Sequence, residues 1–204
     1  PLSASSYPVS DNTYTAQWSF QLTPNITKTG CPQTFTVVDK IAPKCPTNNT
    51  KTHTDVCKLT AAEITNEIKV LVAGYATALD NCTSNNNLNV TVSAPAELTA
   101  NGSATYSYTI TDAYNNTIST CEQTIEIAVA DFEIPTVPSS STVQCLADVK
   151  APHEAGSGIT MPEVKDALGN TLTYTGPVEG GTYTDCEGTK TYTYTYTDCA
   201  DHSH

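Results

Sequence analysis

The sequence predicts an all-β protein with one short helix, and three observations predict this class. Tyr and Thr alternate with a period of two in long stretches, which is the pattern of strands with one buried face. Thr, Ser, Asn and Tyr dominate the polar residues and favour strands and turns. Helical spacing of apolar residues is found at 60–73.

Two stretches of alternating residues predict strands, and each is followed by a polar turn. Tyr106, Tyr108 and Ile110 share one face before the turn DAYNN, and residues 118–129 read as the return strand of a hairpin. Tyr192, Tyr194 and Tyr196 share one face before the turn DCADH. The chain given stops at His204, so this second hairpin is expected to lack its return strand.

A helix is expected from about residue 61 to about residue 72. Residues 60–63 have the form of a capping box, and one helical face carries Ile64, Ile68 and Leu71. The alternative is an irregular strand, because residues 68–72 are also β-prone.

Six aspartates recur in two sets of three, which indicates a module present about twice. The first set opens the segments VVDKIAP, ALDNC and YSYTITDAYNN, and the second opens VADFEIP, VKDALGN and YTYTYTDCADH. Asp80 and Asp112 are 32 residues apart, as are Asp166 and Asp198. The six residues are Asp39, Asp80, Asp112, Asp131, Asp166 and Asp198.

The repeat predicts three parts in the chain. Residues 13–39 echo the closing strands at 106–131, so 1–39 is expected to be an arm that closes a neighbouring unit. Residues 40–131 form a complete domain, and residues 132–204 form a domain without its last strand. Residues 13–39 resemble closing strands whose opening strands are absent, and the 132–204 domain lacks its closing strand. These two patterns are complementary, so residues 13–39 are predicted to donate the strand that the 132–204 domain lacks.

Composition excludes several classes of function. The chain has 21 acidic and 9 basic side chains and a net charge of −12, so a nucleic-acid partner is not expected. No apolar run is long enough for insertion into a membrane. No GxSxG, HExxH or Gly-rich phosphate loop is present, so we do not expect an enzyme.

Cysteines and sequons predict an extracellular or cell-surface location. Eight cysteines without a CxxC pair indicate a disulfide framework made in an oxidising compartment. We expect the chain to be a mature or excised part of a secreted product. The candidate glycosylation sites are Asn25, Asn48, Asn81, Asn89, Asn101 and Asn115.

The segments VVDKIAPKCP, ALDNC, YSYTITDAYNN and STCEQTIEIAVAD resemble hyalin-repeat and related immunoglobulin-like tandem modules of bacterial secreted and cell-surface proteins. Residues 132–204 resemble a sister repeat through STVQC, GNTLTYTGPV and the segment that ends at His204. The resemblance implies tandem immunoglobulin-like β-sandwich domains.

The resemblance also implies a pairing of the cysteines. It implies the bonds Cys45–Cys121 and Cys57–Cys82, and it would leave Cys186–Cys199 to join neighbouring strands. By analogy of position, Cys145 is expected to pair with a Cys31. Ala167 stands where the DNC segment would place a cysteine in the second module. Spacing alone cannot choose among the 105 possible pairings of eight cysteines.

In such a sandwich, each set of three aspartates is expected to converge at a junction between modules. Three close carboxylates repel one another unless a cation neutralises them. Oxygen ligands in turns, completed by Asn81, Asn115 and backbone carbonyls, suit Ca²⁺. The alternative for any one of these residues is an ordinary turn former.

Two other patterns have plainer interpretations. The Tyr/Thr ladder could present a sugar-binding platform, but such ladders more often pack across strands. His202 and His204 could clip a metal ion, but a solvated tail is the simpler interpretation.

The expected function is therefore mechanical. We expect a structural subunit of an extracellular fibre or surface appendage, in which modules joined end to end are stiffened by calcium and completed by a strand of the next unit. The same pattern would arise from covalent continuation in one giant repetitive polypeptide. The alternative is an adhesin or carbohydrate-binding segment, with surface glycans as its partners.

Overall fold

The computed structural model describes residues 13–136 and 140–204. Most of the regular structure is strand, and one α-helix lies among several sheets, which confirms the predicted all-β class. The described chain divides into two compact units. The first comprises residues up to 49, 62–95 and 105–123, and the second comprises 50–61, 96–104 and 124–204. The tandem sandwich and the three predicted parts stay predictions.

Four short strands form two ladders at the beginning of the first unit. β1 (Thr13–Ala16) pairs with β4 (Gln33–Thr36), and β2 (Ser19–Thr23) pairs with β3 (Ile26–Thr29), both antiparallel. The side chains of β2 and β3 are exposed along their whole length. These strands therefore carry apolar residues that nothing in their own unit covers, among them Phe20 and Leu22.

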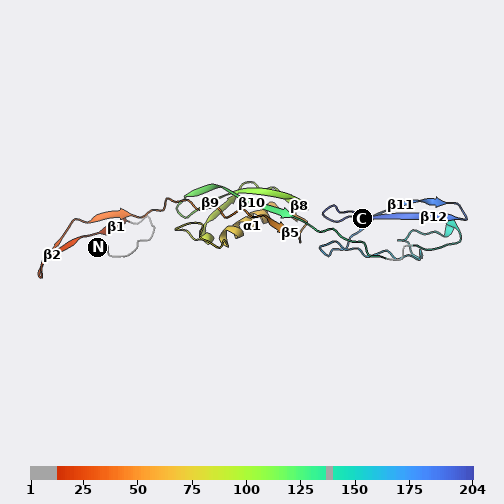
Figure 1. Ribbon diagram of the computed structural model, residues 1–204, viewed down its shortest axis with the longest axis horizontal. Helices are drawn as coiled ribbons and strands as arrows, with labels where there is room; N and C mark the ends of the chain where they lie inside the picture. Colours follow the sequence, from red (N-terminus) through yellow and green to blue (C-terminus); the bar gives the residue numbers. More distant parts are fainter. Residues whose placement is uncertain (1–12, 137–139) are drawn as a thin grey trace. The chain divides into compact units, whose positions relative to one another are not determined.

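The helix α1 (Ala61–Ala73) is close to the predicted one (Figure 1). Its buried side chains are Ile64, Ile68 and Val72, whereas Leu71 is only half-buried. Val72 follows Ile68 by four residues and so continues the same helical face. The prediction of Leu71 as the third core residue was therefore wrong by one position.

The central strands follow the predicted alternation. A four-stranded sheet has the order β5-β10-β9-β7, with β5 Lys51–His53, β10 Thr117–Ile127, β9 Ser103–Thr111 and β7 Asn89–Val92. β6 (Lys58–Leu59) pairs with β8 (Leu98–Thr99), and a 3₁₀ turn, η1, spans Asn85–Asn87. Alternate residues of β9 are buried, namely Tyr106, Tyr108 and Ile110.

The last part of the second unit has little regular structure outside one hairpin. After the 3₁₀ turn η2 (Leu146–Asp148), the strands β11 (Tyr174–Tyr183) and β12 (Gly188–Tyr196) form an antiparallel sheet, drawn in blue in Figure 1. Its core is Phe132, Val164 and Tyr196, with Leu172 packed against them. Because the hairpin has only two strands, much of its surface stays exposed.

Candidate functional site

Three predicted aspartates come together in the first unit. The side chains of Asp39, Asp80 and Asp112 are all buried, and one carboxylate oxygen from each lies within 4.8 Å of the others. Within residues 13–136 and 140–204, these three form the one group of three or more His, Cys, Asp or Glu side chains with ligand atoms this close. We call them the first cluster.

Backbone amides of tight turns fix one oxygen of each carboxylate. The amide of Ile41 donates to Asp39 Oδ1 at 3.0 Å. The amides of Cys82 and Thr83 donate to Asp80 Oδ2 at 2.9 and 2.7 Å. Such turns form because a short carboxylate side chain bonds the backbone two or three residues ahead. The turn-former interpretation is therefore correct for these atoms, but it accounts for only part of each carboxylate.

Asp112 is held more completely than its neighbours. Its Oδ1 accepts from the amides of Tyr114 and Asn116, both at 2.8 Å, and its Oδ2 accepts from Asn116 Nδ2 at 2.7 Å. Burial opposes ionisation, but the hydrogen bonds from Asn116 and Tyr114 outweigh it and lower the pKa of Asp112 below its ordinary value. Asp112 is therefore a carboxylate at neutral pH.

Two oxygens of the first cluster have no partner. Asp39 Oδ2 and Asp80 Oδ1 are inaccessible to solvent and make no hydrogen bond. A buried polar atom without a partner costs free energy, about 1–3 kcal/mol and more for a charged group. Because both atoms belong to the same group of carboxylates, a cation between them would satisfy both and offset the mutual repulsion.

The amides that sequence reasoning assigned to this cluster differ from those found. Asn81 is exposed and donates to Cys82 Sγ at 2.9 Å. Asn115 is exposed, with a φ of 67°. Asn116 instead contacts Asp112 and also donates to the carbonyl of Asp39 at 3.3 Å. In the sequence, Asn116 could have been identified by its spacing of four residues from Asp112, because the same spacing recurs in Asp166–Asn170 and Asp198–His202.

Cys82 adjoins the first cluster and is a free, exposed thiol. Desolvation raises the pKa of Cys82, and the charges of Asp39, Asp80 and Asp112 raise it further. The sulfur of Cys82 is not among the group of close ligand atoms, which come from Asp39, Asp80 and Asp112. This leaves a donor set of oxygens, which is the set that hard divalent cations prefer.

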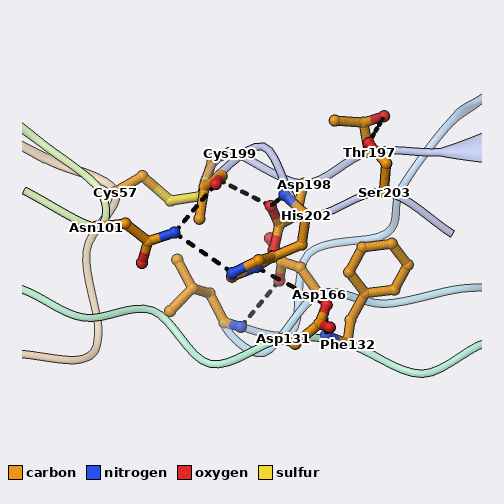
Figure 2. A network of polar contacts seen from close by, with 12 residues as sticks. Cys57, Asn101, Asp131, Phe132, Asp166, Thr197, Asp198, Cys199, His202 and Ser203 are labelled. Atoms are coloured by element: carbon orange, nitrogen blue, oxygen red, sulfur yellow. Dashed lines mark hydrogen bonds and ion pairs between the residues drawn. A yellow bond between two sulfur atoms is a disulfide. The ribbon is translucent and has the colours of Figure 1, made fainter.

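The second set of aspartates lies in the second unit and is arranged differently. Figure 2 shows Asp131, Asp166 and Asp198 gathered near His202. His204 Nε2 lies 3.0 Å from both oxygens of Asp131, and His202 Nδ1 lies 2.8 Å from Asp198 Oδ2 and 3.9 Å from Asp131 Oδ1. We call these five residues the second cluster. The two histidines are thus carboxylate partners. His202 is half-buried, so its interpretation as part of a solvated tail was wrong, whereas His204 is exposed.

Every oxygen of the second cluster's aspartates has a partner. Asp198 Oδ1 accepts from the amides of Ala200 and His202, at 2.8 and 2.9 Å. Asp166 Oδ1 accepts from the amides of Leu168 and Asn170, and its Oδ2 accepts from Asn170 Nδ2 at 3.0 Å. The amide of Phe132 donates to Asp131 Oδ1 at 2.8 Å. Hydrogen bonds therefore satisfy the carboxylates of the second cluster.

The pairing with histidine changes the titration of the second cluster. The hydrogen bond from His204, and then that from the amide of Phe132, lower the pKa of Asp131. The hydrogen bond to Asp198 raises the pKa of His202, and the charges of Asp198 and Asp131 add to this. Both directions favour the ionised forms, an imidazolium at position 202 and a carboxylate at position 131.

Two disulfides are formed among the described residues. Cys45–Cys121 is present, as the resemblance implied. Cys57 is bonded to Cys199, so the expected pairs Cys57–Cys82 and Cys186–Cys199 are not formed. The remaining cysteines, Cys31, Cys82, Cys145 and Cys186, are free and exposed. A Cys31–Cys145 bond between copies stays a prediction.

The bond of Cys57 to Cys199 fastens the turn of the second cluster. Cys199 directly follows Asp198. Beside it, Asn101 Nδ2 donates to the carbonyl of Ala200 at 3.1 Å and lies 3.3 Å from His202 Nε2 (Figure 2). Covalent and polar contacts therefore hold the same five-residue turn.

Comparison with known families found a match for the last part of the chain. Residues 133–204 match the family described as "HYR-like domain with 4 cysteines". This part of the chain is a hyalin-repeat-like module, as the resemblance predicted. Comparisons with curated proteins and with solved structures found no match.

The family match defines a coarse function. HYR-like domains are non-enzymatic repeat modules, and the match suggests an extracellular repeat module for residues 133–204. The two disulfides fit an extracellular domain as well. Among the described residues, no helix is both long and apolar enough to cross a membrane.

Proposed function

We propose that this chain is a structural subunit of an extracellular fibre or surface appendage, in which calcium stiffens the modules and one unit completes the next. The match of residues 133–204 to HYR-like domains, which are non-enzymatic repeat modules, supports the part of the proposal that concerns a repeat module. The proposal has two parts, a cation site and a contact between copies, and they are supported by different observations.

The calcium part is supported above all by the two partnerless oxygens of the first cluster. Asp39 Oδ2 and Asp80 Oδ1 are buried among three carboxylates, and the backbone already fixes the opposite oxygen of each group. Ca²⁺ takes roughly six to eight oxygens and accepts irregular geometry, whereas Mg²⁺ requires near-ideal octahedral geometry and Zn²⁺ favours nitrogen and sulfur. When bound, the ion would neutralise the three carboxylates and tie together the turns that carry them.

At the second set, Asp131, Asp166 and Asp198, calcium is a weaker proposal. Here the carboxylates already have partners, so an ion would have to displace His202 or His204. Calcium binding by isothermal titration calorimetry to the full chain distinguishes the two sets. One site that disappears in an Asp39→Asn/Asp80→Asn variant supports the first cluster, and a second site that disappears with Asp131→Asn would support the other.

The contact between copies is supported by exposed apolar strands and an open sheet edge. In β2 the side chains of Phe20 and Leu22 are 65% and 63% exposed, which is unusual for large apolar residues on alternate positions. The hairpin β11-β12 has two strands. In the described chain, the outer edge of β12 is paired at its end, where Tyr196 exchanges two backbone hydrogen bonds with His204, and the rest of that edge is open. An open edge of this kind accepts a strand from another chain.

The proposed occupant of that edge is the segment 13–39 of a second copy. Its residues Trp18, Phe20 and Leu22 repeat the alternation of Tyr106, Tyr108 and Ile110, which are buried in β9. The same contact would be intramolecular in a longer tandem polypeptide, and the chemistry of the contact is identical in both cases.

The test compares residues 1–204 with residues 40–204 by size-exclusion chromatography with light scattering. We expect the longer chain to self-associate as its concentration rises and the shorter chain to remain monomeric. A full chain with Phe20→Ser and Leu22→Ser should also remain monomeric, whereas Lys28→Ser, on the neighbouring strand, is the control. If the long and short chains are both monomeric and melt at the same temperature, strand donation is wrong.

The alternative is an adhesive or carbohydrate-binding module. The stretch 176–181 was expected to be an exposed loop but lies in β11, and its exposed Val178 is the surface to examine. The neighbouring aromatic side chains contact one another: the rings of Tyr174 and Tyr194 meet edge to face with centroids 5.0 Å apart. Rings packed in this way offer little free face for a sugar, which favours the structural proposal. Binding on a glycan array that disappears with Tyr174→Ala would reverse this preference.

A further inference from the structure

Two of the free cysteines are adjacent in the second unit. Cys145 immediately precedes η2, and Cys186 lies in the turn between β11 and β12. The amide of Leu146 donates to the carbonyl of Asp185 at 3.3 Å. Because Leu146 follows Cys145 and Asp185 precedes Cys186, this bond joins the backbones directly beside the two thiols.

A small cavity lies at the same place. Cys145 and Cys186 are both among the residues that line this cavity of about 70 Å³, together with Leu146, Asp185 and residues that flank them. A disulfide requires Cα atoms roughly 4.4–6.8 Å apart, a separation typical of residues that face each other across a backbone hydrogen bond.

Among the cysteines of residues 140–204, the bond of Cys199 to Cys57 leaves Cys145 and Cys186 as the two free thiols. Cys57–Cys199 removes the partner that had been expected for Cys186, and Cys45–Cys121 lies in the first unit. Both thiols are exposed and therefore accessible to an oxidant. We propose that Cys145 and Cys186 form a third disulfide in the protein.

The bond forms by thiol–disulfide exchange with a small or protein disulfide of the secretory compartment. The thiolate of one cysteine attacks that disulfide and forms a mixed disulfide, and the second thiolate then displaces the reduced half. Two thiols of the chain are oxidised, one external disulfide is reduced to two thiols, and the two protons go to the departing thiolates.

The bond would support the least regular part of the second unit. Between η2 and β11 the described chain has no helix or strand and one isolated bridge, Lys165↔Thr171. This stretch carries the Asp166 turn. A bond from Cys145 to Cys186 closes it into a loop anchored on the hairpin, which restricts the unfolded chain and stabilises the fold.

The proposal is tested on the full oxidised chain by peptide mapping without reduction. We expect a linked peptide pair that contains Cys145 and Cys186, and protection of both thiols from alkylation until a reductant is added. The variant Cys145→Ser/Cys186→Ser should lower the Tm by roughly 5–10 °C. Cys31→Ser, which alters another exposed free cysteine, is the matched control and should leave the Tm unchanged.

Two outcomes would overturn the proposal. One is alkylation of both thiols in the non-reduced protein. The other is a Cys31–Cys145 peptide from covalent dimers, which would instead join two copies. A Cys31–Cys145 bond would contradict the disulfide proposal but would be compatible with strand donation. A Cys145–Cys186 bond would support the disulfide proposal, and strand donation would still be tested by the oligomeric state. The two proposals can therefore fail independently.

Discussion

The two aspartate clusters are built from the same kind of turn but differ in the groups that contact their carboxylates. In the first, Asn116 bonds Asp112, and two buried oxygens of Asp39 and Asp80 have no partner. In the second, His202 occupies the position equivalent to Asn116 and contacts two carboxylates. An amide supplies hydrogen bonds without charge, whereas an imidazole can also supply a positive charge. The second cluster therefore has histidine side chains that can supply positive charge beside its carboxylates, whereas for the first cluster we propose a bound cation.

The clusters also differ in how their last turn is held. Cys199 in the second turn is bonded to Cys57, whereas the equivalent residue in the first turn is Ala113. The first turn is held by hydrogen bonds, including one from the amide of Ala113 to Thr83 Oγ1 at 3.3 Å. A covalent bond in one turn and an ion between the other turns would be two solutions to the same mechanical problem.

Loss of the covalent bond should have the largest effect. We expect Cys57→Ser/Cys199→Ser to lower the free energy of unfolding by about 2–5 kcal/mol, because the bond closes a long loop. The measurement is chemical denaturation followed by circular dichroism. The pKa of His202, followed by NMR, should also fall towards its ordinary value as the turn loosens. If stability and this pKa are both unchanged, the bond does not hold the second cluster.

Calcium should have the next largest effect, and it should act on the first cluster. At a concentration 100 times its Kd, an ion that binds only the folded state adds about 2.7 kcal/mol to stability. We expect calcium to raise the Tm of the full chain by several degrees and a chelator to reverse this. Asp39→Asn/Asp80→Asn should abolish the response, and Asp166→Asn, the control in the second cluster, should retain it.

A melting curve that is identical with calcium and with chelator would contradict the cation site. Substitution of Asp39 and Asp80 by Asn would then be expected to stabilise the protein without any ion, since it removes two repelling charges from a buried place.

The sequence predicted the strands, the helix and the convergence of one aspartate set, because these follow from local periodicity and from an internal repeat. Alternation in β9 predicts which Tyr residues are buried without knowledge of their neighbours. The partner of Cys57 could not be predicted in this way, because 142 residues separate it from Cys199 and the approach depends on the folded chain. The role of His202 could have been predicted from its spacing of four residues from Asp198, the same as in the two Asp–Asn pairs.

Asn101 should contribute a smaller amount, and only to the second cluster. We expect Asn101→Ala to cost about 1 kcal/mol, because its Nδ2 donates to the carbonyl of Ala200. A glycan on Nδ2 would replace one of its hydrogens, so we expect this sequon to be unoccupied even in a glycosylating host. Exposed sequons beside the first cluster, at Asn81 and Asn115, would remain available.

The control for Asn101 is Ser103→Ala, which removes the sequon and keeps the amide. It should change neither the mass of the attached glycans nor the Tm. A mass loss of one glycan with Ser103→Ala would show that Asn101 is modified and that its contact with the turn does not form.

The smallest expected effect is a dependence of stability on pH that distinguishes the clusters in the presence of chelator. The raised pKa of His202 means that its contribution is complete below about pH 6.5 and is lost as the pH rises through the folded-state value. The lowered pKa values of Asp131 and Asp198 mean that theirs is present above about pH 4 and is lost as the pH falls. The second cluster should therefore be most stable between these limits, measured as Tm from pH 3 to pH 9.

His202→Asn gives the second cluster the amide that the first one has. We expect this variant to lose the decline in Tm above pH 6.5, because no imidazolium is left beside Asp198. The decline in Tm in acid should remain, because hydrogen bonds also lower the pKa values of Asp112 and Asp166 despite their burial. If the exchange also creates a calcium response at Asp131 and Asp198, the side chain at position 202 determines whether a histidine or a bound calcium ion neutralises these carboxylates. If the alkaline decline is unchanged, His202 does not supply the charge, and the contrast between the two clusters lies in their geometry alone.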